Sequence, residues 1–174
     1  MAVKVGEKVP EFTAQSYVNG EFRKVSLSDY KGKWVILFFY PRDFTFVCPT
    51  EIKGFAQAEG DFKKLNAEVI GASTDSEYSH QAWFERDLPM VKFPILADTN
   101  QRISRDYGVL VEGEGLALRG TFIIDPDGVL QYMVVANTSI GRSIQETVRT
   151  LEALQSGGLC PVDWKPGEKT LGKT

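Results

Sequence analysis

The most reactive side chains in this chain are few: one histidine, His80, and two cysteines, Cys48 and Cys160. Zinc sites usually have four ligands at short paired spacings, and these three residues are scattered, so we expect no zinc site. The cysteines are also too far apart for the C-x-x-C pair of a dithiol oxidoreductase. A structural disulfide is not expected in a cytoplasmic chain, because that compartment keeps thiols reduced. Two interpretations remain: two inert buried thiols, or two thiols with a redox function.

Cys48 lies where a buried strand, predicted over 34–40, leads into a helix predicted over 50–65. In open α/β sheets, ligands bind beyond the carboxyl ends of the strands. We expect Cys48 in the first helical turn, where free backbone N–H groups and the helix dipole favour an anion. Helix N-termini lower the pKa of a cysteine thiol from about 8.5 to roughly 3.5–7.5. Pro49 is compatible with that turn, which has no helical N–H bond to lose.

Thr45 is close enough in sequence to direct its hydroxyl at the Cys48 sulfur or at a substrate. The alternative is a small apolar thiol at a strand–helix junction, with Thr45 as the helix cap, since free cysteines are often buried. A Cys–His acyl-transfer enzyme would depend on His80 alone, and nothing in the sequence brings that residue to Cys48. Activation by the helix and an arginine is therefore preferred.

The elements that must position these residues alternate between strand and helix and end with a hairpin and a helix. The turn at 125–128 (DPDG) predicts that the last two strands form a hairpin. Asp75 is predicted to cap a helix, and Asp98-x-x-Gln101 resembles a capping box that opens another. Ser143-x-x-Glu146 is a capping box for the last helix, which Gly157-Gly158 ends. The predicted strands are 34–40, 68–73, 93–97, 117–124 and 129–136.

This order predicts one α/β domain with a thioredoxin-like fold, in which a mixed central sheet has helices on both faces. We assign residues 1–157 to this domain. Residues 158–174 form a predicted C-terminal arm, which is rich in Pro, Gly and Lys from Pro161 onward and carries Cys160. The fold class alone does not identify the chemistry.

Composition narrows the possible functions. A length of 174 residues suits one domain, and 43% apolar and 25% charged residues are ordinary globular values. A net charge of −3 and a pI near 5.3 argue against a general nucleic-acid or anionic-membrane binder. The longest apolar run, Trp34–Tyr40, is far shorter than the roughly 20 residues of a transmembrane helix. The first residues show no signal-peptide pattern, so we expect a cytoplasmic protein without nucleic-acid or membrane partners.

The segment FFYPRDFTFVCPTE contains Pro41-x-x-x-Thr45-x-x-Cys48, which resembles the signature of the peroxiredoxin family. The second cysteine, Cys160, lies in a C-P-x-x-W context, and in this respect the chain resembles the typical 2-Cys, alkyl hydroperoxide reductase-like branch of the family. The resemblance covers nearly the whole chain, and it implies a thioredoxin-like fold and a thiol-dependent peroxidase. Three further motifs follow in the family order: His80-Gln81-Ala82-Trp83, Arg119-Gly120-Thr121-Phe122-Ile123-Ile124-Asp125 and Cys160-Pro161-Val162-Asp163-Trp164-Lys165.

The resemblance implies that Cys48 is the peroxidatic nucleophile, whose thiolate takes the terminal oxygen of a hydroperoxide and becomes a sulfenic acid. Arg119 would donate to the thiolate and the peroxide together, and the hydroxyl of Thr45 and the N–H of Cys48 would complete the cradle. Pro41 would shield the thiolate from water. Glu51 would orient the arginine; alternatively it is only a favourable acid in a first helical turn.

Cys160 is implied to be the resolving cysteine, contributed by the other subunit of an antiparallel homodimer that can assemble into a ring. Hydrogen peroxide and organic hydroperoxides are the implied substrates, and thioredoxin or a flavoprotein disulfide reductase is the implied electron donor. No bound cofactor or metal is needed. The alternatives are a free C-terminal thiol without a partner and, for the protein, a holdase chaperone or redox-signalling binding protein.

The remaining motif residues have weaker assignments. We interpret His80 as a packing residue and expect Arg42 to be solvated. Several aromatic side chains either wall an apolar pocket for the organic tail of the peroxide or belong to the core; these are Phe39, Phe44, Phe46 and Trp83.

Overall fold

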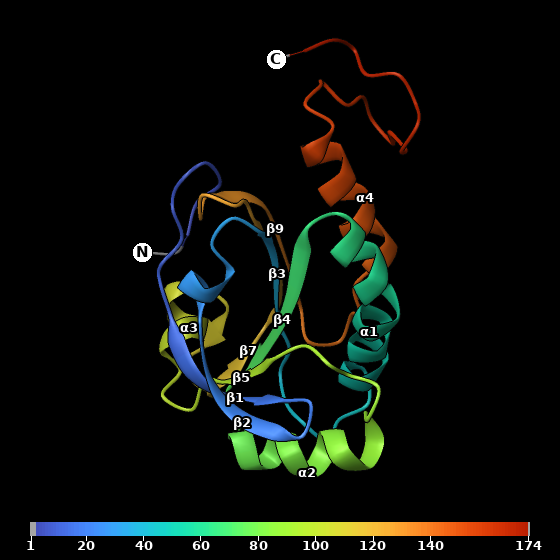
Figure 1. Ribbon diagram of the computed structural model, residues 1–174. Coiled ribbons are helices and arrows are strands. Elements are labelled where there is room, and N and C mark those ends of the chain that lie inside the picture. The colour runs from blue at the N-terminus through green and yellow to red at the C-terminus, as the bar shows by residue number, and fades with distance from the viewer. Residues whose placement is uncertain (1–2, 174) are drawn as a thin grey trace.

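The computed structural model describes residues 3–173, which form a seven-stranded sheet with helices on both faces (Figure 1). The strand order is β2-β1-β5-β4-β3-β8-β9, and a separate two-stranded sheet pairs β6 with β7. The strands are β1 (Thr13–Val18), β2 (Glu21–Ser26), β3 (Trp34–Phe39), β4 (Ala67–Ser73), β5 (Ile95–Ala97), β6 (Leu110–Val111), β7 (Leu116–Ala117), β8 (Arg119–Ile124) and β9 (Leu130–Ala136). The helices are α1 (Cys48–Lys64), α2 (Glu77–Asp87), α3 (Arg102–Asp106) and α4 (Ile144–Gln155), with a 3₁₀ turn at Leu27–Tyr30.

The central strand, β3, pairs in parallel with β4 and antiparallel with β8. Its side chains alternate between two apolar clusters: Val35, Leu37 and Phe39 belong to one, and Ile36 and Phe38 to the other. Helices α1, α2 and α4 contribute to the second cluster, and α3 contributes to the first. The strand is apolar throughout because both of its faces are covered. The predicted mixed sheet with helices on both faces is confirmed.

The predicted hairpin is also present, but its first strand is shorter than expected. Asp125 closes the turn between β8 and β9, because its Oδ1 accepts hydrogen bonds at 2.9 Å from the backbone of Asp127 and Val129. The strand predicted from residue 117 is divided at Leu118, whose N–H bonds to the carbonyl of Val109. Strand β8 therefore begins at Arg119 and runs antiparallel to β3, which puts this arginine beside the carboxyl end of β3.

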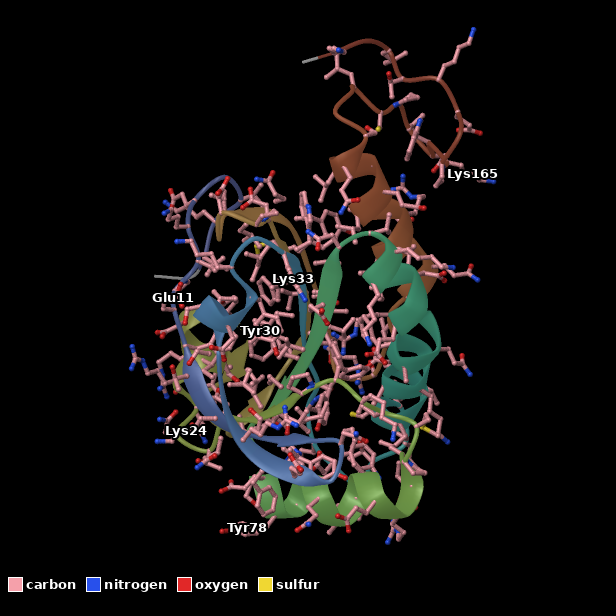
Figure 2. The ribbon with its side chains drawn as sticks, viewed as in Figure 1. Glu11, Lys24, Tyr30, Lys33, Tyr78 and Lys165 are labelled. Atoms are coloured by element: carbon pink, nitrogen blue, oxygen red, sulfur yellow. The ribbon has the colours of Figure 1, made fainter. Side chains whose placement is uncertain are left out.

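An antiparallel hairpin of β1 and β2 precedes β3, and it has no counterpart among the predicted strands. It joins the sheet through β1, which pairs with the distant β5. Tyr78 of α2, which Figure 2 labels, packs edge-on against Phe22 of β2, with 5.2 Å between ring centroids. This hairpin therefore forms one edge of the sheet and contacts α2.

Two predicted helix caps are wrong in detail. Ser76, rather than Asp75, caps α2 by accepting a hydrogen bond from the backbone of Ser79. The carboxylate of Asp75 instead accepts from the backbone N–H of Asp43, in the loop after β3. Gln101 lies outside α3 with a left-handed backbone (φ 61°), whereas Asp98 reaches over it to accept from two helical N–H groups. A carboxylate accepts from whichever N–H group the fold brings near it. The sequence positions of Asp75 and Asp98 therefore did not determine which N–H groups they bind.

The chain ends in an extended segment beyond α4, which Figure 1 shows at the opposite end of the molecule from α2. Ser143 caps α4 by accepting from Glu146 N–H, as predicted, although the Glu146 side chain pairs with Arg149 instead of returning to the cap. After α4, Leu159 exchanges backbone hydrogen bonds of 2.8 Å with Leu171 and Gly172. Among residues 3–173, no helix has the length and apolar character that a membrane span requires.

Candidate active site

Cys48 is the first residue of α1, where the chain turns from the end of β3 into the helix. Its side chain is 1% exposed, and Pro49 lies in the first turn after it, as predicted. Val47, not Thr45, holds the cap position, and it makes no side-chain cap hydrogen bond. The interpretation of Thr45 as a helix cap is therefore wrong. A first helical turn leaves backbone N–H groups and the positive end of the helix dipole for an anion.

Arg119 points its guanidinium at the sulfur of Cys48. Its Nη1 lies 3.3 Å from Cys48 Sγ and also donates to Glu51 Oε2 at 2.7 Å. Its Nε and Nη2 both donate to the carbonyl of Thr138, at 2.9 and 2.6 Å. The side chain is almost fully buried, so its positive charge is poorly screened and the hydrogen bonds that it donates are strengthened. Residues far apart in sequence thus place a fixed cation at the thiol.

Glu51 is buried one turn into α1 and links two arginines. Its Oε1 accepts from the backbone N–H and the Nε of Arg142, both at 2.9 Å. Its Oε2 accepts from Nη2 of Arg142 at 2.9 Å and from Nη1 of Arg119 at 2.7 Å. Burial raises the pKa of Glu51, but hydrogen bonds and charge from Arg142, with the charge of Arg119, outweigh burial and hold the pKa below its usual value. The carboxylate is therefore ionised beside Cys48.

Arg142 was not among the residues predicted from the sequence. Its Nη1 donates to the carbonyl of Gly120 at 2.7 Å, and its Nη2 donates to the carbonyl of Phe39 at 2.7 Å, in addition to its bonds with Glu51. It therefore joins the ends of β3 and β8 to the helix that carries Cys48. In the sequence it stands in a loop just before the α4 cap, where an arginine is usually solvated, so no local pattern distinguishes it.

The loop before Cys48 holds the other two predicted site residues, Thr45 and Pro41. The hydroxyl of Thr45 donates to the carbonyl of Arg42 at 2.9 Å, so it does not donate to the sulfur. Its oxygen retains lone pairs that can accept a hydrogen from a bound molecule. Pro41 is buried directly after Tyr40, and it brings no N–H group that would attract water to this position. The Arg42 side chain is exposed, as expected, and donates to the carbonyl of Glu114.

Cys160 lies away from the cluster that Cys48, Arg119 and Glu51 form. Both cysteines are free, and Cys160 is half-buried beyond α4, with its sulfur 3.3 Å from Ser156 Oγ. The N-terminal end of α1 lies toward α2, whereas the segment after α4 lies at the other end of the molecule (Figure 1). Since α1 alone has 17 residues, it is about 25 Å long. The two thiols of one chain are therefore well separated.

His80 belongs to a buried polar network beneath the loop. Its Nδ1 lies 2.7 Å from Asp43 Oδ2 and its Nε2 lies 3.1 Å from the carbonyl of Leu96. The hydroxyl of Tyr40 donates to Asp43 Oδ1 at 2.7 Å, and burial raises the pKa of this tyrosine well above its usual value. His80 is therefore buried, as the packing interpretation expected, but hydrogen bonds to Asp43 and Leu96 hold it in place. Within the described part of the chain, no group of three His, Cys, Asp or Glu side chains could hold a metal ion.

The four aromatic candidates separate into core and surface residues. Phe39 is fully buried, and Phe46 is 93% exposed. Trp83, which is 2% exposed, and Phe44, which is 47% exposed, pack with tilted rings at 5.8 Å between ring centroids. Both line a pocket next to Thr45 and Pro49. Two of the four residues therefore form a wall beside the thiol-bearing segment.

Comparison with known proteins agrees with this geometry. Residues 5–133 match the model of the AhpC/TSA family. The putative peroxiredoxin YkuU of Bacillus subtilis (strain 168) is 53% identical over 175 residues, which cover 96% of this chain and 97% of that protein. A thioredoxin peroxidase of Echinococcus granulosus is 50% identical over 180 residues, which cover 98% of this chain and 93% of that protein.

Solved structures show the same fold. The reduced 2-Cys peroxiredoxin of Plasmodium vivax superposes with a TM-score of 0.92 at 37% identity, over 95% of this chain and 91% of that one. The AhpC of Enterococcus faecalis superposes with a TM-score of 0.87 at 40% identity, over 92% of this chain and 100% of that one. With a thioredoxin-like sheet, a matching family model and relatives at about half identity over nearly its whole length, this chain belongs to the AhpC/TSA family and is a peroxiredoxin, a thiol-dependent peroxidase.

Proposed function

We propose that this enzyme reduces hydrogen peroxide and organic hydroperoxides through a cycle of two cysteines, with Cys48 as the peroxidatic thiol and Cys160 of a second subunit as the resolving thiol. The observation that carries the proposal is the buried guanidinium of Arg119, whose Nη1 lies 3.3 Å from Cys48 Sγ. A structural thiol needs no fixed cation, whereas a nucleophilic thiolate is stabilised by one.

In the first step, the thiolate of Cys48 attacks the terminal oxygen of the hydroperoxide. A sulfur–oxygen bond forms while the oxygen–oxygen bond breaks, so the thiolate is oxidised by two electrons to a sulfenic acid. The departing oxygen leaves as hydroxide or alkoxide and takes a proton to become water or an alcohol. Negative charge moves from the sulfur to that oxygen, so donors directed along this path stabilise the transition state more than the ground state.

Arg119 supplies the charged donor for this displacement, and its neighbours hold it in place. Thr138 accepts from Nε and Nη2, and Nη1, which carries two N–H groups, faces both Glu51 and Cys48. Arg142 also pairs with Glu51, so the negative charge of this carboxylate is shared between two arginines and does not fully neutralise Arg119. A donor fixed before the reaction needs no reorganisation when charge develops, which is the main source of electrostatic catalysis.

Thr45 and Pro41 receive the hydroperoxide in this proposal. Because the Thr45 hydroxyl donates to the carbonyl of Arg42, its lone pairs are oriented to accept the O–H hydrogen of the substrate. Pro41 is buried in the loop between β3 and α1, and in this proposal it keeps water from the thiol. Exclusion of water strengthens the interactions of Arg119 with the sulfur and the peroxide.

In the second step, the thiolate of Cys160 attacks the sulfenic sulfur, and a disulfide forms as hydroxide leaves and becomes water. The separation of the two thiols within one chain favours a partner subunit, in an antiparallel homodimer that can assemble into a ring. A dithiol reductant, thioredoxin or a flavoprotein disulfide reductase, then reopens the disulfide. Electrons pass only through thiols, so no bound cofactor or metal takes part, and we expect the cycle in the cytoplasm, where thiols are kept reduced.

Stopped-flow tryptophan fluorescence on the reduced protein tests the first step, because Trp83 lies next to the thiol segment. We expect fast second-order oxidation by hydrogen peroxide, with no signal from Cys48→Ser and a normal first phase from Cys160→Ser. A holdase or redox-signalling protein would not require Cys48, and retention of full activity by Cys48→Ser would overturn the proposal.

A further inference from the structure

A pocket of about 490 Å³ opens beside the thiol-bearing segment, and the cycle proposed above leaves its purpose unexplained. Thr45 and Pro49, which flank Cys48 in sequence, are among its lining residues. Phe44 and Trp83 form an apolar wall. Lys53, Arg86 and Asp87 form its charged side. An occupant of this pocket therefore lies against the active-site loop, between apolar rings and a charged rim.

In the apolar wall, Trp83 is buried, whereas Phe44 remains partly open to solvent. Phe44 has a left-handed backbone (φ 56°), which a bulky side chain rarely adopts. Its ring remains 47% exposed, although burial would stabilise it. The guanidinium carbon of Arg86 lies 5.0 Å above the ring, which fixes the ring from its outer side. Strained residues that persist in a fold are concentrated at functional sites.

The charged side carries a net positive charge. Arg86 and Asp87 neutralise each other through two hydrogen bonds of 2.9 and 2.6 Å. Lys53 is close enough to contribute to lowering the pKa of Asp87, after the larger effects of Arg86 and Trp83. Among residues 3–173, no carboxylate forms a direct ion pair with Lys53, so its ammonium group can bind an added anion. Lys53 follows Cys48 by five positions on α1, a rise of about 7.5 Å.

We propose that this pocket selects organic hydroperoxides that carry a carboxylate. The organic body packs against Phe44 and Trp83, the carboxylate pairs with the ammonium group of Lys53, and the hydroperoxide reaches Cys48 past Thr45. This inference depends on the proposed function, because the chemical step is the same. Cys48 supplies the electrons, and the transferred oxygen ends on its sulfur. Lys53 is then a specificity-determining residue that makes no contact with the reacting atoms.

A matched pair of substrates isolates the effect of the carboxylate. Cumene hydroperoxide with a carboxylate in the para position and the methyl ester of the same compound share one oxygen–oxygen bond and one apolar body. We expect the wild-type protein to react faster with the acid than with the ester. Substitution Lys53→Gln should reduce the acid-to-ester ratio of second-order rate constants by about two- to fivefold, the range of an exposed ion pair. Added salt should reduce the ratio in the wild type and leave it unchanged in Lys53→Gln.

Two controls separate this inference from its alternatives. Lys64→Gln removes the same charge from the same helix, but Lys64 is exposed outside the pocket and pairs with Asp61, so the ratio should not change. Oxidation by hydrogen peroxide should be equal in the wild type and both variants. If hydrogen peroxide oxidises the protein fast but the acid-to-ester ratio is one, the pocket assignment is overturned and the proposed function stands. The same conclusion follows if both substitutions change the ratio equally. Absence of oxidation by any peroxide overturns the proposed function itself.

Discussion

Replacing Glu51 by Gln tests the charge arrangement around Cys48. The substitution keeps the shape of the side chain but removes the negative charge between two arginines that are both almost fully buried. It also turns an amide N–H₂ group toward guanidinium donors, which cannot accept a hydrogen bond. Removing one partner of a buried ion pair costs about 3–5 kcal/mol, so we expect the free energy of unfolding to fall by about 3 kcal/mol.

The expected effect on the reaction is smaller than the loss of Arg119 itself. Thr138 still accepts two hydrogen bonds from Arg119 in the variant, so the guanidinium stays near the sulfur with a less defined orientation. We expect the rate constant for oxidation of Cys48 by hydrogen peroxide to fall about tenfold, which corresponds to about 1.4 kcal/mol. Complete loss of such a donor costs about 10²–10³-fold.

The variant should also change how stability depends on pH. The pKa of Glu51 in the folded protein lies below its ordinary value of 4.5. A group with a lowered folded pKa stabilises the protein fully above its unfolded pKa and loses that contribution as the pH falls through the folded value. The wild type should therefore begin to lose this contribution once the pH falls below about 4.5, so it should be less stable at about pH 3 than at about pH 7 on this account, and Glu51→Gln should not show this loss.

Urea unfolding at both pH values and stopped-flow oxidation measure these effects. Glu59→Gln is the matched control, because Glu59 lies on the same helix in a surface pair with Lys63 and should cost at most about 1 kcal/mol. If Glu51→Gln unfolds at the wild-type urea midpoint and reacts at the wild-type rate, the carboxylate does not position Arg119, and the reasoning is refuted.

Three further predictions concern the other groups of the site. Arg119→Met should fold and lose about 10²–10³-fold in the rate of Cys48 oxidation; a loss below tenfold would contradict its assigned role. Cys160→Ser should abolish the peroxide-induced dimer on non-reducing gels while each active site still consumes one peroxide, and a persistent dimer band would exclude Cys160 as the resolving thiol. Asp43→Ala should lower the free energy of unfolding by about 2–3 kcal/mol in urea, because His80 and its neighbours lose their buried acceptor, whereas a change within error would show that solvent replaces it.

Several elements could be predicted because their signals are local. The apolar run of β3 identified a strand covered on both faces, and the DPDG turn identified the β8–β9 hairpin. Pro49 and the change from strand to helical periodicity placed Cys48 at a helix start. Each of these signals acts within a few residues, since backbone propensity and turn geometry depend on neighbours in sequence.

Other elements depended on distant partners. The β1–β2 hairpin enters the sheet by pairing with β5, and that pairing leaves no mark in the residues of β1 alone. The caps at α2 and α3 were misassigned for the same reason, because Asp75 and Asp98 bind N–H groups that only the folded chain brings to them. A charged side chain in a sequence does not indicate which opposite charge it will meet.

The sequence by itself indicated the thiol and its place at the start of a helix, and the family resemblance predicted the set of Cys48, Thr45, Arg119 and Glu51. Only the tertiary structure decided how these groups act together. It joined β8 to β3 and so brought Arg119 to the sulfur, and it added Arg142, which the sequence left indistinguishable from a solvated arginine. The physical reason is that local backbone preferences extend over a few residues, whereas buried charges are arranged by contacts that form only when the sheet closes.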